Sequence, residues 1–280
     1  NYMPSSGLAL VDSEEFEFWI EDRAYDPQIV EADLRKIADL GFNMISVFIY
    51  VQSTERGNLL DLLHRARALG LMVNLSLRPN EPPFPASRDV LTTLVTTFRT
   101  PEKDEIMAYD IAWEPWWGGE TQRIMRHGKD WVRWVEERYG SREAAAREWD
   151  FAPDHLEEFP SNDQLRYDGP WRDAVAAYRN FVRETLQKAY GEARDHLRRL
   201  DPNHLVSFRQ SEGANPLADP AYYPIPLECI AEAVDFFSPE AYGIGDSARS
   251  ARTMLFAAAY GQGLAPGKPM IWAEYGKSVW

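Results

Sequence analysis

Two glutamates stand where apolar stretches of the sequence break into loops. Glu114 directly follows residues 107–113, and Glu274 directly follows residues 269–273. A matched pair of carboxyl groups is the minimum equipment for hydrolysing a glycosidic bond, because one protonates the leaving oxygen and the other attacks the sugar or activates water. The two glutamates therefore indicate glycosidic chemistry, provided that the fold brings their side chains together.

Helical and strand-like segments alternate in front of Glu114. A helix is predicted from a cap at Asp26 to a stop at Gly41, and residues 42–50 follow as an apolar strand. The same unit then repeats, with helices predicted at residues 59–69 and 90–98 and strands at residues 71–77 and just before Glu114. This alternation is typical of a parallel sheet whose strands are joined by crossover helices.

The stretch after Glu114 is long, charged and helical. We expect a helical insertion at about residues 118–168, with helices at 130–139 and from Ser141, and then a crossover helix from about 170 to 200. Strands resume at residues 204–208, 234–238 and 269–273, and a helix is expected at 247–260. No linker rich in Gly, Ser or Pro divides the chain, so we expect residues 1–280 to form one catalytic domain.

The chain supplies seven strands if residues 1–4 are the tail of the first. Glu114 then follows the fourth strand and Glu274 follows the seventh. The predicted fold class is α/β, a (β/α)8 TIM barrel with a helical insertion after strand four. Such a barrel closes with eight strands, and the eighth is not evident in this sequence.

The composition disfavours several classes of function. The chain has 44 acidic and 30 basic residues and a net charge of -14, which argues against nucleic acid or an anionic membrane as a partner. We expect a soluble protein with no membrane insertion, either cytoplasmic or secreted after removal of a leader. Cys229 is the sole cysteine and the five histidines lack paired spacing, so we expect neither a metal nor an organic cofactor.

Three motifs follow one another along the chain: Trp113-Glu114-Pro115, the segment 238–243 with Tyr242, and the segment 273–276 with Glu274. This order resembles the clan A glycoside hydrolases, the retaining (β/α)8 group that includes cellulases, β-mannanases and β-galactosidases. Residues 1–5 also resemble the first-strand motif of many members. Residues 137–149 resemble, more weakly, a stretch common in family 42 β-galactosidases, and other features are similar to family 5-like members.

The resemblance implies a role for each acid. Glu114 stands where the family carries the general acid that later acts as base, and Trp113, Trp116 and Trp117 would desolvate it. Glu274 stands at the position of the nucleophile, which Tyr242 would hold by a hydrogen bond. A retaining mechanism needs the two carboxyl groups roughly 5 to 5.5 Å apart.

The sequence departs from the family at three positions. Trp113 replaces an asparagine that contacts the sugar 2-hydroxyl, so that contact must come from elsewhere. Ser46 replaces an arginine beside the nucleophile, and either Arg78 or Arg209 could supply the charge instead. Glu240 stands where some members have histidine, and an extra acid there could raise the pKa of a neighbour or meet a sugar hydroxyl.

Further side chains near the strand ends are candidates for sugar binding, rings by stacking and polar groups by hydrogen bonding. Core packing or a solvated loop position would explain several of them nearly as well. The candidates are Tyr2, Arg78, Asn80, Trp113, Trp116, Trp117, Arg209, Gln210, Glu240 and Trp272.

Two functions are therefore expected from the sequence. The first is a retaining glycoside hydrolase that cleaves β-glycosidic bonds of an oligosaccharide or polysaccharide by double displacement. The alternative is a non-catalytic carbohydrate-binding protein on a glycosidase-like barrel, which the changes at Trp113 and Ser46 favour. The sequence does not distinguish β-galactosides, β-glucosides and β-mannosides, because pocket-lining loops decide among them.

Overall fold

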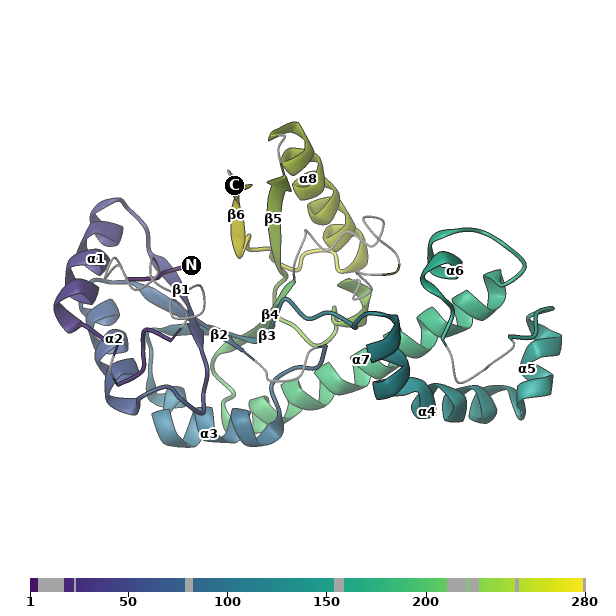
Figure 1. The fold of residues 1–280 in the computed structure, drawn as a ribbon. Coiled ribbons are helices and arrows are strands. Elements are labelled where there is room, and N and C mark those ends of the chain that lie inside the picture. The colour runs from purple at the N-terminus through teal and green to yellow at the C-terminus, as the bar shows by residue number, and fades with distance from the viewer. Residues whose placement is uncertain are drawn as a thin grey trace.

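The fold is a parallel sheet with helices packed around it (Figure 1). The computed structural model describes residues 1–4, 18–22, 24–78, 83–153, 159–210, 221, 227–244 and 247–278. Six strands pair in the same order as they occur in the chain. They are β1 (Met44–Ile49), β2 (Met72–Leu77), β3 (Ile106–Trp113), β4 (Leu205–Gln210), β5 (Ser238–Ile244) and β6 (Glu274–Ser278).

The connections between the strands are mostly helical. The helices are α1 (Pro27–Asp39), α2 (Arg56–Ala68), α3 (Arg88–Phe98), α4 (Glu120–Tyr139), α5 (Arg142–Glu148), α6 (Asn162–Arg166), α7 (Arg172–Leu200) and α8 (Ser247–Leu264). Two short 3₁₀ turns, η3 (Thr100–Glu102) and η5 (Leu227–Cys229), complete the described elements. The predicted alternation of helices and parallel strands is confirmed.

The first helix shows why the local predictions hold. The Asp26 side chain accepts hydrogen bonds from the backbone N–H groups of Gln28 and Ile29, so it caps the start of α1. Val30 and Leu34, one turn apart on the same face, are fully buried. Gly41 has φ of +86°, a conformation that side chains disfavour, and the chain turns there towards β1.

The sheet curls into a barrel that is open between β6 and residues 1–4 in the described part of the chain. Residues 1–4 lie beside β1, where the Tyr2 N–H donates to the Ser46 carbonyl at 2.8 Å. Arg209 on β4 contacts side chains of both β1 and β6, which are not its neighbours in the sheet. Only a curled sheet permits such contacts, so the predicted barrel class is confirmed.

The structure corrects the position of Glu274 relative to its strand. The prediction placed a strand at residues 269–273 with Glu274 after it, whereas Glu274 is the first residue of β6. Pairing does begin earlier, since Phe237 N–H donates to Pro269 O at 2.9 Å and Ile271 N–H donates to Phe237 O at 2.8 Å. Glu274 therefore lies within a paired segment, whereas Glu114 follows β3 as predicted.

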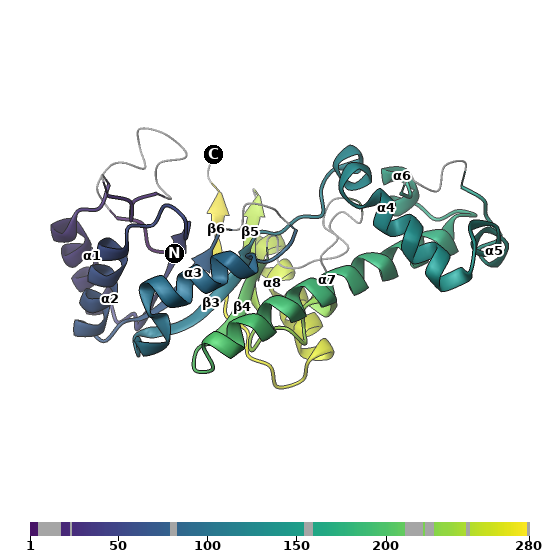
Figure 2. The ribbon, with the colours of Figure 1, turned by 90° about the horizontal axis from the view of Figure 1, so that it is seen from below.

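The predicted helical insertion is present, and its first helix is longer than expected. Helix α4 starts at Glu120 rather than near residue 130, and α5 begins after its Ser141 cap. Helices α4, α5 and α6 gather against the N-terminal part of α7, away from the sheet (Figure 2). The C-terminal part of α7 packs against the barrel, where His196 Nε2 lies 2.8 Å from Oγ1 of Thr92 in α3.

Buried apolar residues of the barrel and of the helical insertion belong to one contiguous core.

Every helix in the described ranges is too short or too polar to cross a membrane.

Candidate active site

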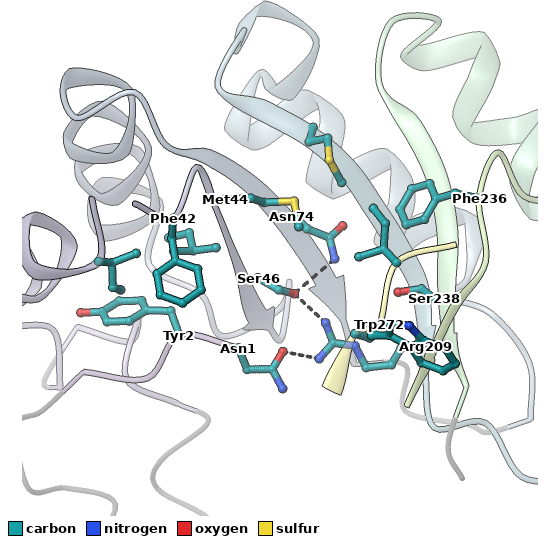
Figure 3. Close-up of a pocket in the computed structure, with 15 residues that line it drawn as sticks. Asn1, Tyr2, Phe42, Met44, Ser46, Asn74, Arg209, Phe236, Ser238 and Trp272 are labelled. Carbon is teal, nitrogen blue, oxygen red and sulfur yellow. Dashed lines mark hydrogen bonds between the residues drawn. The ribbon is translucent and has the colours of Figure 1, made fainter. Parts of the chain in front are cut away.

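Arg209 of β4 is the centre of the polar cluster inside the barrel (Figure 3). Its fully buried guanidinium donates from Nη1 to Glu274 Oε1 at 3.0 Å and to Asn1 Oδ1 at 2.5 Å. From Nη2 it donates to Ser46 Oγ at 2.6 Å, and Asp110 Oδ2 lies 3.4 Å away. One cation thus connects residues beside and on β1 with β3 and β6.

The small side chain at Ser46 makes room for this arginine. The sequence offered Arg78 and Arg209 as replacements for an arginine at that position, and Arg209 is the one that contacts Glu274. An arginine that donates to a carboxylate forms a charge-assisted hydrogen bond, which favours the ionised form of the acid. Arg209 therefore supplies the positive charge beside Glu274 from a different strand.

Two buried residues that sequence analysis missed, Asn74 and Asp110, hold Arg209 and its partner Ser46 in place by hydrogen bonds. Asn74 of β2 donates from Nδ2 to Ser46 Oγ at 3.2 Å and to Asp110 Oδ2 at 2.8 Å. Burial raises the pKa of Asp110, while Arg209 and Asn74 oppose that rise. The sequence did contain a signal for these two residues, because Asn74 and Asp110 are polar residues within largely apolar strands.

Glu114 is held at the end of β3 in an uncommon backbone conformation. Its φ is +39°, and its N–H donates to the carbonyl of Arg209 at 2.9 Å. Pairing between β3 and β4 is irregular between Asp110 and Trp113, just before this residue. A non-glycine residue with positive φ is strained and persists where its surroundings enforce it, which is common at functional sites.

Glu240 of β5 brings the two predicted catalytic acids into one cluster. It is directly opposite Glu274 in the strand register, and its side chain forms a hydrogen bond with Glu114. Burial raises the pKa of Glu240 to about 11, and the hydrogen bond with Glu114 and the charges of Glu274 and Glu114 act in the same direction. Arg209 opposes the rise. Three carboxyl groups, one from the residue after β3 and one each from β5 and β6, thus lie near one another, with Arg209 beside them.

Trp113 has a different role from the amide that it replaces. The Arg78 guanidinium lies over the face of the Trp113 ring and 4.8 Å from the centroid of the Phe48 ring. The two rings meet edge to face at 5.7 Å. A cation over an aromatic face is attracted by the ring quadrupole, so Trp113 and Phe48 fix Arg78 near the site.

The other predicted aromatic residues fall into two groups. Trp116 and Trp272 are half-buried, and Trp272 lines a cavity of about 420 Å³ inside the barrel. Trp117 is fully buried, with its indole N–H donating to the Tyr178 hydroxyl at 2.8 Å. The ring of Trp117 leaves no surface on which a sugar could stack, so it is a core residue.

The remaining predicted residues are only partly described. Tyr2 is buried edge-to-face against Trp19 at 5.2 Å and lines the same cavity. Gln210 is buried on β4, in register with Pro239. Asn80 and the side chain of Tyr242 lie outside the described residues. Within the described ranges, no group of three or more His, Cys, Asp or Glu residues is arranged to hold a metal ion.

The overall fold is similar to that of several solved glycosidases. A β-galactosidase from a Rahnella species matches with a TM-score of 0.65 at 16% identity, and one from Bacillus circulans with 0.63 at 16%. Each alignment covers 89% of this chain and 42% of the other. An endo-β-1,4-mannanase from Thermotoga petrophila matches with 0.54 at 14%, covering 90% of this chain and 58% of its own.

By sequence, the chain matches no protein-family description and no curated protein. The structural likeness establishes a glycosidase-type barrel fold. This chain spans less than half the length of the β-galactosidases that it resembles.

Proposed function

We propose that this protein is a retaining glycoside hydrolase that cleaves β-glycosidic bonds of an oligosaccharide or polysaccharide. The observation that carries the proposal is the cluster of Glu114, Glu240 and Glu274 beside Arg209. Buried carboxyl groups placed close together cost a fold stability, and such a cluster is typical of a functional site. The likeness to β-galactosidases and a β-mannanase supports a β-linked sugar as the substrate class.

Glu274 and Glu114 have distinct roles in this reaction. In the first step a Glu274 oxygen forms a bond to the anomeric carbon as the glycosidic C–O bond breaks, and Glu114 gives its proton to the leaving oxygen. In the second step Glu114 takes a proton from a water molecule. The water oxygen then displaces Glu274 from the sugar, and the anomeric configuration is retained.

Arg209 is proposed to orient Glu274 for this attack. Its hydrogen bond to Oε1 fixes one oxygen of the Glu274 carboxylate. Asn1 contacts the same terminal nitrogen, Nη1, and Ser46 and Asp110 contact the other, Nη2, so these partners restrict the position of the guanidinium. The half-buried rings of Trp116 and Trp272 are proposed as platforms for the apolar face of a pyranose.

The test is hydrolysis of a panel of β-glycosides by wild type, Glu274→Gln and Glu114→Gln. Glu274→Gln should lose at least about 10,000-fold in kcat on every substrate, since no other residue replaces a nucleophile. Glu114→Gln should lose most on alkyl glycosides and least on nitrophenyl glycosides, because a good leaving group needs no proton.

Glu105→Gln provides a matched control. Glu105 is also a buried glutamate, next to β3, but its nearby cation is Arg67 at 3.8 Å. This variant should keep wild-type rates. Wild-type rates in Glu274→Gln would refute the assignment, and saccharide binding by a wild type that hydrolyses no member of the panel would favour a non-catalytic binding protein.

A further inference from the structure

Glu240 is a third acid in the site, and the double-displacement reaction leaves it without a role. Its side chain is 1% exposed, the deepest of the three clustered glutamates. It comes from β5, between the strand that carries Arg209 and the strand that carries Glu274. A buried carboxyl group in a site that already holds two others needs a specific explanation.

The contact between Glu240 and Glu114 requires a proton. Two ionised carboxylates have only acceptor atoms, so a hydrogen bond between them forms only when one carries a hydrogen. Glu240 Oε1 is also buried and accepts no hydrogen bond from a donor in the described part of the chain. An ionised carboxylate would be costly there, whereas a neutral acid would not.

The surroundings make Glu240 harder to ionise than Glu114, so Glu240 is the acid that keeps its proton. Glu240 is fully buried and Glu114 half-buried, so ionisation costs more at Glu240. The charged groups that face Glu240 are Glu114 after β3, Glu274 on β6 and Arg209 on β4. Arg209 already contacts Glu274 and Asp110, and the pKa of Glu240 is raised to about 11.

We propose that Glu240 stays protonated throughout the reaction and donates its O–H to Glu114, so that it is a positioning residue for the acid/base. This inference rests on the proposed function. When Glu114 gives its proton to the leaving oxygen, it becomes a carboxylate, and the hydrogen bond from Glu240 stabilises that charge. Glu114 recovers a proton from water in the second step, and the proton on Glu240 never leaves.

The test compares Glu240→Gln with Glu240→Leu, two neutral variants of similar size. Glutamine keeps an N–H donor for Glu114, and leucine removes it. Glu240→Gln should keep kcat within about threefold of wild type, whereas Glu240→Leu should lose at least about tenfold. The alkaline limb of the kcat/KM profile should stay in place for Glu240→Gln and move to higher pH for Glu240→Leu, because Glu114 then holds its proton more tightly.

Two outcomes would overturn the inference in an active wild type. If Glu240 is ionised in the working enzyme, Glu240→Gln removes a negative charge beside Glu114. The alkaline limb of the kcat/KM profile then moves to lower pH by about one pH unit or more. If Glu240→Leu keeps the wild-type rate and profile, Glu240 does not position Glu114.

A readout without substrate separates this inference from the proposed function. At neutral pH the infrared spectrum of wild type should contain the carbonyl band of one more protonated carboxylic acid than the spectrum of Glu240→Gln. An active wild type whose carboxylic-acid band is no larger than that of Glu240→Gln refutes the protonated Glu240 and leaves the proposed function in place. A wild type that shows this difference but hydrolyses no β-glycoside refutes the proposed function and, with it, the role of Glu240 towards an acid/base.

Discussion

The barrel interior and the helical region α4–α7 are both buried, yet they are built from opposite kinds of side chain. In the interior, Arg209 contacts two carboxylates, a hydroxyl and an amide. In the helical region, Trp131 packs against a set of rings at centroid distances of 5.5 to 6.4 Å, and these belong to Trp134, Trp149, Phe159, Tyr178 and Phe181.

The difference shows which part of the molecule serves stability and which serves chemistry. Aromatic burial stabilises a fold directly, because it removes apolar surface from water. A buried cluster of charges gives little net stability and is expensive to disturb. The interior therefore breaks the usual rules of core composition where the proposed chemistry takes place. Variants in the two regions should separate activity from stability.

Among the variants that compare the two regions, Arg209→Met should have the largest combined effect on stability and activity. The change removes the cation that pairs with Asp110 and Glu274, and it should lower the free energy of unfolding by about 3 to 5 kcal/mol. It should also lower kcat/KM by about a hundredfold or more, since Glu274 loses its fixed hydrogen bond. Chemical denaturation and steady-state kinetics measure the two effects.

Arg172→Met is the matched control for that variant. Arg172 pairs with Asp168 at the surface of the helical region, where both side chains are more than two-thirds exposed. Stability and activity should stay close to wild type, because exposed ion pairs contribute little. An Arg209 variant that behaves like this control would show that the interior cluster is not needed.

Trp131→Ala should affect stability alone. Trp131 is 1% exposed, and its removal leaves a large cavity among the rings, so the free energy of unfolding should fall by about 3 to 5 kcal/mol. The kcat of the folded fraction should be unchanged. A loss of activity larger than the loss of folded protein would show that the helical region contributes to the site.

A smaller effect, dependent on pH, is expected at Asp201, which follows α7. Burial opposes ionisation of Asp201, but hydrogen bonds from His204, Tyr109 and the Asn203 N–H outweigh it and lower the pKa to about 2. Because this pKa lies below the unfolded value of about 3.9, the group stabilises the fold above that pH by about 2 kcal/mol. The contribution is lost as the pH falls through about 2.

Asp201→Asn removes this dependence. Stability of the variant relative to wild type should be lowest near neutral pH, and the difference should shrink between about pH 4 and pH 2. Urea unfolding at several pH values measures it. A difference that stays constant over this range would mean that the charge of Asp201 does not stabilise the fold.

Local sequence patterns predicted much of the fold because the forces behind them act over a few residues. The Asp26 cap, the buried pair Val30 and Leu34 and the turn at Gly41 specify α1 on their own. The same holds for the repeated helix and strand units up to Glu114. The start of β6 was misplaced because pairing with β5, rather than any local signal, decides where that strand begins.

The candidate site was only partly predictable because its contacts join distant parts of the chain. Arg209 and Ser46 are 163 positions apart, and the sequence did not decide whether Arg209 or Arg78 supplies the charge that is missing at Ser46. Trp117 looked suitable for sugar stacking, but Tyr178 and Phe181 of α7 cover it. The buried polar residues Asn74 and Asp110 left a signal, since each interrupts an apolar strand.

The most direct test of the account is to trap the covalent intermediate. A fluorosugar inhibitor with a good leaving group should form a glycosyl ester that is stable enough for mass spectrometry of the intact and digested protein. We expect one added sugar, located on the peptide that contains Glu274 and absent in Glu274→Gln. Hydrolysis of β-glycosides with the adduct on another residue, or with inversion at the anomeric carbon, would contradict it.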